Sequence, residues 1–177
     1  AVAKHITYPV VVKLSSISHR NRVEDGLVVL GLPNEKRVTQ AFETVQEKSS
    51  HSLDGPDGEG ILVQKYISNT AEVTIRVQDD PLFGPLVTCG LGGAFVEVLG
   101  DVAHRVSPLT DVDARTMIRQ LRGFPLLLGF RGYPAADVPA IEDALLRISR
   151  LVEAVPHILE IDIGPLFVFA PGEGLVI

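Results

Sequence analysis

Short strand-like segments occur in groups along this chain, and that grouping is the feature that most constrains its fold. Runs rich in β-branched and apolar residues lie at 8–14 and 27–32, and a second group lies at 61–67, 72–77 and 85–89. In a doubly wound sheet, helices would alternate regularly with the strands, and here they do not. The grouping therefore predicts an α+β fold with antiparallel sheets and packed helices.

Three segments have the apolar spacing of helices. One begins at Asn34, a suitable N-cap, and runs to about Glu47. A second begins near Asp111 and ends at Gly123, and a third begins around Pro139 and ends before Pro156. We expect a flexible loop at 49–60, a closing hairpin formed by 158–163 and 166–169, and a last strand at 175–177.

Length and composition are those of a globular chain with an aliphatic core. The 177 residues suffice for one domain, or for two small lobes that share a cleft. The sequence is 46% hydrophobic but only 6% aromatic and has no tryptophan, so Val, Leu, Ile and Ala must build the core. Because both ends fall within strand-like or apolar sequence, we expect 1–177 to be a fragment of a longer protein, truncated at both ends.

Charge and cysteine content argue against several classes of function. The net charge is −6 and the basic residues are scattered, which argues against nucleic-acid binding. The single cysteine, Cys89, cannot form an internal disulfide, which favours a reducing compartment. The sequence contains neither a membrane-spanning run nor a signal peptide, so we expect a cytoplasmic protein with no membrane partner.

Phosphate chemistry, if present, must use an uncommon loop. The chain contains neither a G-x-x-x-x-G-K-[ST] loop nor a G-x-G-x-x-G fingerprint. Gly90, Gly92 and Gly93 follow a predicted strand, and backbone N–H groups in such a turn can approach an anion. A tight structural turn followed by a surface glutamate at Glu97 explains the same residues equally simply.

The wider sequence around these glycines resembles the ATP-grasp domain of ADP-forming acyl-CoA synthetases, as in the β part of acetate-CoA ligase. The likeness rests on ordered blocks, of which DPLFGP at 80–85 and GLGGAFVEVLGDVAHRVSPL at 90–109 are the most distinctive. YPVVVK, ILVQKYI, RGFPLLLGFRG and EIDIGPL occur in the family's order and spacing. The resemblance implies an ATP-grasp fold that covers nearly the whole chain.

The resemblance also implies a reaction and partners. In this family, acyl-CoA, ADP and phosphate interconvert with a carboxylic acid, CoA and ATP through a phosphohistidine. The ATP-grasp part handles ATP or ADP with Mg²⁺, and a CoA-binding synthetase domain or subunit carries the principal phosphohistidine. We therefore expect the isolated segment to be inactive in the complete reaction.

The same resemblance assigns candidate nucleotide-binding residues. It places a phosphate contact at Lys13 and the adenine-binding backbone at Gln64, Lys65 and Tyr66. It also implies nucleotide contacts by Glu72 to the ribose, by the glycine turn and by two arginines, that is, Glu72, Gly92, Gly93, Arg105 and Arg131. Each charged side chain among them also fits an ordinary exposed strand position or a surface ion pair.

Two departures from the family pattern concern catalysis. His19, in the place of a phosphate-relaying histidine, is followed by a longer segment with one glycine fewer, so a solvated loop is the competing interpretation. Gly164 stands where the family has a metal-binding asparagine, and glycine offers no side-chain oxygen to Mg²⁺. Glu97 and Asp162 remain as candidate metal ligands.

These departures leave alternatives to a catalytic domain. A degenerate, non-catalytic region of this kind, fused to an acetyltransferase domain, occurs in some protein lysine acetyltransferases. A module that docks a partner domain through an apolar surface is a third hypothesis.

Overall fold

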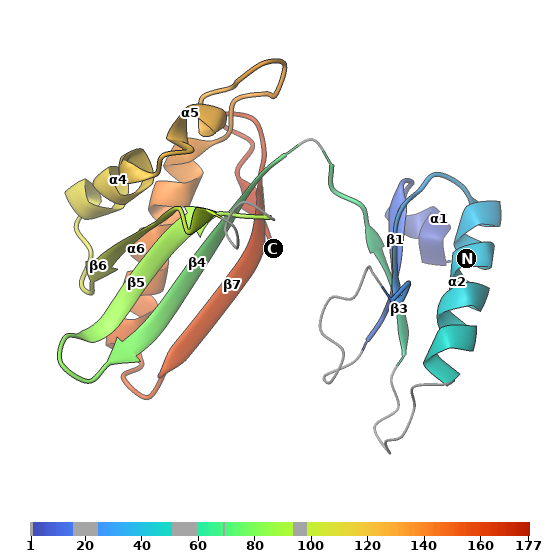
Figure 1. The fold of residues 1–177 in the computed structure, drawn as a ribbon, viewed down its shortest axis with the longest axis horizontal. Helices are drawn as coiled ribbons and strands as arrows, with labels where there is room; N and C mark the ends of the chain where they lie inside the picture. The colour runs from blue at the N-terminus through green and yellow to red at the C-terminus, as the bar shows by residue number, and fades with distance from the viewer. Residues whose placement is uncertain (1, 16–24, 51–59, 69, 94–98) are drawn as a thin grey trace. The chain divides into compact units, whose positions relative to one another are not determined.

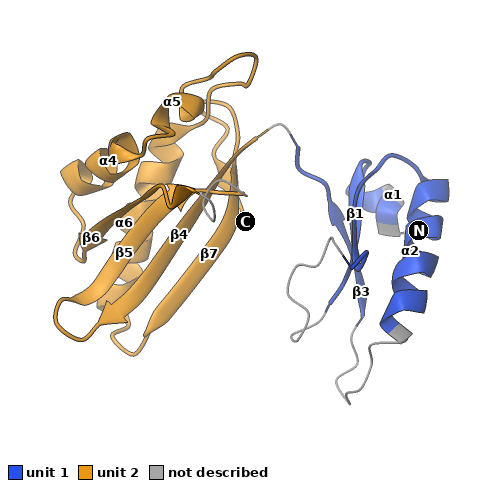
Figure 2. Cartoon of the chain, in the orientation of Figure 1, with its two compact units in different colours: residues 1–68 blue, residues 69–177 orange. Residues whose placement is uncertain are grey.

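The computed structural model describes residues 2–15, 25–50, 60–68, 70–93 and 99–177. The chain forms two compact units, residues 1–68 and residues 69–177, here called unit 1 and unit 2 (Figure 2). Each has its own sheet and its own hydrophobic core. Of the helices that the structure describes, none combines the length and the apolar character needed to cross a lipid bilayer.

Unit 1 is a three-stranded antiparallel sheet with helices on one face (Figure 1). Its strands are β1 (Val10–Leu14), β2 (Val28–Leu32) and β3 (Ile61–Lys65), in the order β2-β1-β3. Its helices are α1 (Val2–Ile6) and α2 (Glu35–Ser50). The side chain of Asn34 accepts a hydrogen bond from the N–H of Arg37, which caps α2 as expected.

Alternation along β1 separates the two faces of the unit 1 sheet. Val10, Val12 and Leu14 are buried in the core with Val45 of α2. Lys13 lies between two of these residues in sequence, so its side chain belongs to the opposite face. The sheet therefore presents one apolar face to the helices and carries Lys13 on the other.

Unit 2 is a five-stranded antiparallel sheet in the order β6-β5-β4-β7-β8. The strands are β4 (Ala71–Asp80), β5 (Gly84–Leu91), β6 (Val102–Val106), β7 (Glu160–Val168) and β8 (Leu175–Val176). Two helices pack against one face, α4 (Asp111–Gln120) and α6 (Val138–Ala154), and the short α5 (Phe124–Leu127) lies near α4 (Figure 1).

The helices of unit 2 begin at capped residues. The hydroxyl and N–H of Thr110 form a reciprocal capping box with Asp113 at the start of α4. Asp137 caps α6 and also accepts hydrogen bonds from the N–H groups of Gly172 and Gly174. The N–H of Gly174, followed by those of Ala140 and Gly172, lowers the pKa of Asp137 below 3.8 against the opposing effect of burial.

The core of unit 2 lies between the sheet and α4 and α6. The inward residues of β4, Val73, Ile75 and Val77, pack with the helical stripe that includes Ile141 and Leu145. Cys89 of β5 is fully buried in the same core, and desolvation raises the pKa of its thiol to about 12. The intervening residues of β4 occupy the opposite face of the sheet.

The structure confirms the α+β class and corrects one predicted element. Residues 158–169 do not form a hairpin, because β7 is one continuous strand that pairs with β4 on both sides of a register shift. Gly164–Pro165, which resembled a turn in sequence, lies at this irregularity within the strand. Residues 49 and 50 belong to α2, whereas 51–59 of the predicted loop lie outside the described residues.

Candidate functional site

A cavity of about 330 Å³ opens in unit 2 where β4 begins and β5 ends. Its walls are mainly apolar, and Glu72 provides the one charged side chain among the lining residues. The lining comprises Thr70, Ala71, Glu72, Leu91, Gly92, Gly93, Leu126, Leu127, Tyr133 and Pro134. An apolar concavity with few polar groups is typical of a small-molecule site.

Glu72 and the glycine turn, which the family resemblance assigns to nucleotide binding, lie next to each other. The N–H of Gly92 donates a hydrogen bond to the carbonyl oxygen of Glu72. A Cβ atom at Gly92 would lie 2.5 Å from Cβ of Glu72, and one at Gly93 would lie 3.3 Å from the carboxylate oxygen Oε2. Glycine is required here because the backbone passes this close to Glu72, and the Gly92 N–H is already engaged within the protein.

Two predicted residues of unit 1 share one face of its sheet. Lys13 of β1 pairs in register with Leu62, and Val11 pairs with Gln64. Because side chains two residues apart point the same way, Lys13 and Gln64 both lie on the face opposite to the helices. A cation and an amide are thus available together on this face.

Lys65 and Tyr66 make internal contacts instead. The ammonium group of Lys65 lies 3.0 Å from Oγ1 of Thr7 and 3.3 Å from the carbonyl oxygen of Tyr8. The N–H of Tyr66 donates to the carbonyl oxygen of Pro9 at 3.1 Å. These contacts hold the segment before β1 against the end of β3.

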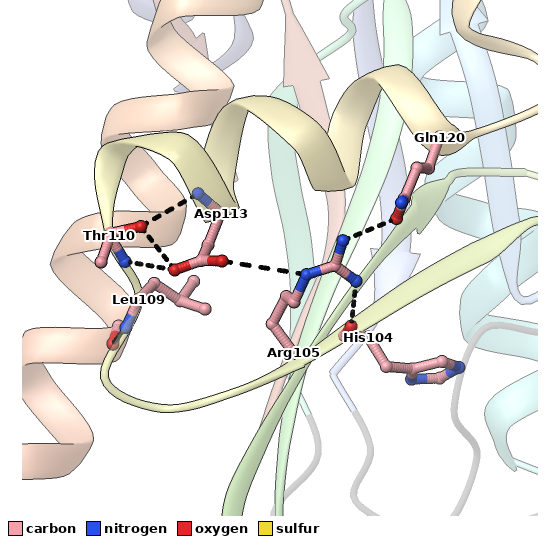
Figure 3. Close-up of polar contacts among 7 residues, drawn as sticks. His104, Arg105, Leu109, Thr110, Asp113 and Gln120 are labelled. Carbon is pink, nitrogen blue, oxygen red and sulfur yellow. Dashed lines mark hydrogen bonds and ion pairs between the residues drawn. The ribbon is translucent and has the colours of Figure 1, made fainter.

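Arg105 takes part in a polar network next to α4 (Figure 3). Its guanidinium donates to the carbonyl oxygen of His104 at 2.8 Å and to Oε1 of Gln120 at 2.9 Å, and its Nε lies 3.9 Å from Asp113. The Thr110 hydroxyl and N–H lower the pKa of the Asp113 carboxyl, and Arg105 adds to this. These contacts give Arg105 an anchoring role for α4.

Arg131 is positioned differently, on a tight turn. Phe130 and Tyr133 form an isolated bridge, and Arg131 and Gly132 between them have positive φ angles of 47° and 90°. The guanidinium carbon of Arg131 lies 5.3 Å from the centre of the Phe130 ring. Tyr133, at the end of this turn, lines the cavity, whereas Arg131 is not among the described lining residues.

Of the two candidate metal ligands, only Asp162 lies among the described residues. Oδ1 of Asp162 lies 3.2 Å from Nε of Arg76, a cation that would compete with a bound metal. Gly164 has no side chain, and the described residues contain no cluster of three or more His, Cys, Asp or Glu suited to a metal. Glu97 and the predicted relay residue His19 lie outside the described residues.

Sequence reasoning missed several residues that the structure places at or near the site. Tyr133 and Pro134 line the cavity. Arg76 of β4 lies opposite Asp162 on the adjacent strand β7. Tyr133 follows the RGFPLLLGFRG block directly, which was an available signal. Arg76 lies within the alternating pattern of its strand, so its outward direction could be inferred, but its pairing with Asp162 depends on strand register.

The two antiparallel sheets with packed helices, and a cavity bounded by a glycine turn, are features of a nucleotide-binding α+β domain. Residues 1–177 match the family model described as the ATP-grasp domain, and the chain belongs to this family.

Its similarities are to ADP-forming ligases. It is 38% identical to the β subunit of ADP-forming acetate–CoA ligase II of Pyrococcus furiosus, over 99% of this chain and 75% of the relative. It is 37% identical to ADP-forming acetate–CoA ligase I of Archaeoglobus fulgidus, over 99% of this chain but only 25% of that longer relative.

A solved structure agrees with these sequence relatives. The dinucleotide-forming acetyl-coenzyme A synthetase 1 of Ca. Korarchaeum cryptofilum, in complex with coenzyme A and Ca-AMPCP, matches with a TM-score of 0.87 and 36% identity. The match covers 98% of this chain and 75% of that one. These relatives are ligases or synthetases, and they give no support to the alternative of an acetyltransferase-linked regulatory domain.

Proposed function

We propose that this chain is the nucleotide-binding ATP-grasp portion of an ADP-forming acyl-CoA synthetase of the acetate–CoA ligase type. Its role is to exchange a phosphoryl group between ADP or ATP and a phosphohistidine. The observation that carries the proposal is the cavity of unit 2, where Glu72 meets the glycine turn of the most distinctive block of the family resemblance. Near-complete coverage by β-subunit relatives supports it.

The chemistry of the cavity suits the nucleoside part of the substrate. Apolar walls formed by Leu91, Leu126 and Leu127 can accept the faces of a base, because a base buries apolar surface on binding. The carboxylate of Glu72 can accept hydrogen bonds from the ribose hydroxyls. The same carboxylate repels phosphates, so the phosphates must lie beyond it.

Cations must then offset the phosphate charge. Lys13 on its sheet face and Arg131 on its exposed turn are the proposed phosphate contacts. Phosphoryl transfer relies mainly on positioning and charge neutralisation, which makes such side chains sufficient for a direct role. Arg105 is the poorer choice of the two arginines because three groups of unit 2 already hold its guanidinium.

The full reaction requires a partner. Acyl-CoA, ADP and inorganic phosphate give the carboxylic acid, CoA and ATP, and the proposed partner is a CoA-binding synthetase domain or subunit. The relatives support this arrangement, since one is a separate β subunit and another is a single chain four times the matched length. His19 as phosphate relay belongs to the same proposal, and Glu97 as metal ligand applies if the nucleotide binds with Mg²⁺.

Isothermal titration calorimetry with ADP tests the function. We expect binding to the wild-type chain and about tenfold weaker binding to Glu72→Gln, because a charged acceptor contributes about 1.5–3 kcal/mol. Glu153→Gln, on the exposed surface of α6, is the matched control and should bind as wild type does. Absence of binding at millimolar ADP, with and without Mg²⁺, would rule the proposal out.

A further inference from the structure

Four polar side chains form a row across the helix-free face of the unit 2 sheet. In register, Asp162 of β7 lies opposite Arg76 of β4, Arg76 opposite Thr88 of β5, and Thr88 opposite His104 of β6. Arg76 and Asp162 form an ion pair at 3.2 Å, and Oγ1 of Thr88 lies 2.8 Å from Nδ1 of His104. A positive charge therefore lies at the centre of this face.

The ion pair leaves most of the guanidinium available. Only Nε of Arg76 contacts Asp162, and no further contact of Arg76 occurs among the described residues. The side chain of Arg76 is 59% exposed and that of Asp162 is 52% exposed. An exposed pair of this kind contributes little to stability. The two outer nitrogens of Arg76 can donate to a ligand while Nε remains with the carboxylate.

Two glycines lie beside the strand segment between Glu72 and Arg76. Glu72, Thr74 and Arg76 alternate along β4 on the same face, and four residues of strand span about 13 Å. Thr74 lies opposite Gly90 on β5, and a Cβ atom at Gly164 of β7 would lie 3.0 Å from Cγ2 of Thr74. Because Gly90 and Gly164 project no side chain, an extended anion can lie along them between the carboxylate and the guanidinium.

We propose that Arg76 binds the terminal phosphates of the nucleotide and supplies there the charge that a divalent metal usually supplies. This inference rests on the proposed function and deepens it. Asp162 holds the arginine in place and has its own charge neutralised, so it does not repel the phosphates. Arginine forms bidentate hydrogen bonds with phosphate and keeps its charge at every physiological pH. Nucleotide affinity should therefore depend little on Mg²⁺.

Calorimetric titrations with ADP and with AMP, each in Mg²⁺ and in EDTA, test the inference. For the wild-type chain, we expect ADP affinity to change by less than about threefold when Mg²⁺ is removed. Arg76→Gln should weaken ADP binding by about tenfold, equivalent to 1.4 kcal/mol, and leave AMP binding unchanged. Arg147→Gln, which breaks a comparable exposed pair with Asp143 on α6, is the control and should bind ADP as wild type does.

A second variant, Asp162→Asn, tests separately whether this carboxylate positions Arg76 or binds a metal. Asp162→Asn removes the carboxylate that holds Arg76 in place, so it should weaken ADP binding to the same extent in Mg²⁺ and in EDTA. Weaker ADP binding by Asp162→Asn in Mg²⁺ alone would identify this carboxylate as a metal ligand and overturn the inference. Unchanged ADP affinity in Arg76→Gln, or loss of wild-type binding in EDTA alone, would also overturn it and leave the proposed function intact. Absence of ADP binding in Mg²⁺ and in EDTA alike would overturn both this inference and the proposed function.

Discussion

Units 1 and 2 both pack helices against one face of an antiparallel sheet, but they do so with different side chains. The fully buried side chains of the unit 1 core include Val10, Val12 and Val45, whereas those of unit 2 include larger ones such as Ile75 and Ile141. In unit 2, Asp137 also links three backbone N–H groups, those of Ala140, Gly172 and Gly174. The difference indicates that each unit is stabilised by its own core, and that unit 2 has the larger buried side chains.

The largest expected effects come from core truncation in each unit. Ile141→Ala should lower the unfolding free energy of unit 2 by about 2–5 kcal/mol, because it removes buried atoms and leaves a cavity. Val45→Ala should lower that of unit 1 by a smaller amount. Hydrogen exchange followed peptide by peptide would locate each loss. Equal loss of protection in both units from either variant would contradict their separate cores.

The glycine turn offers the next largest effect. Gly92→Ala places a Cβ atom 2.5 Å from Cβ of Glu72 and 2.9 Å from its carbonyl carbon, so β4 or the turn must move. We expect a loss of about 1–3 kcal/mol in unit 2, measured by denaturant unfolding, with weaker ADP binding. Gly60→Ala in unit 1 is the control, since a Cβ atom there meets nothing within 4 Å. An equally small loss of unfolding free energy in both variants would show that the backbone at Gly92 can move to accommodate a Cβ atom.

An intermediate effect should depend on pH. The folded state lowers the pKa of Asp137, so its stabilisation is present above 3.8 and is lost as the pH falls through the lower folded value. Asp137→Asn should melt at a lower temperature than wild type near neutral pH, and the difference should shrink below about pH 4. Calorimetric melting across pH 2–7 measures this. A constant difference would show that the charge of Asp137 contributes nothing.

The smallest effect is expected at Lys65 in unit 1. Lys65→Met loses exposed hydrogen bonds to Thr7 and to the carbonyl oxygen of Tyr8, which should cost about 0.5–1 kcal/mol. Nucleotide affinity, measured by titration with ADP, should not change. The family resemblance assigns Lys65 a backbone contact with adenine, which this substitution keeps. A tenfold weaker affinity would show that the side chain of Lys65 also contributes to nucleotide binding.

Sequence patterns predicted most elements because local signals and tertiary packing agree in them. The stripe of Ile141, Leu145 and Ile148 with Asp137 before it specifies α6 almost to the residue. The signals failed at β7, where Gly164–Pro165 is typical of a turn but pairing with β4 continues the strand. Strand β6 was missed because its alternation is short, and its place is set by pairing with β5.

The candidate site was only partly predictable for a related reason. Gly92 and Gly93 lie in a distinctive sequence block, Glu72 lies in β4 ahead of it, and all three come together in the cavity. Lys65 and Arg105 lie in similar blocks, but their polar neighbours engage them. Pairings such as Arg76 with Asp162 join residues far apart in sequence, and only the register of two strands reveals them.

The buried thiol of Cys89 can report local unfolding of unit 2. It is the single cysteine, it lies in the core of unit 2, and its pKa of about 12 keeps it protonated and unreactive while folded. A thiol reagent should therefore modify the protein only when the sheet of unit 2 opens. The rate of thiol labelling would then measure local opening of unit 2 alone, because unit 1 contains no cysteine.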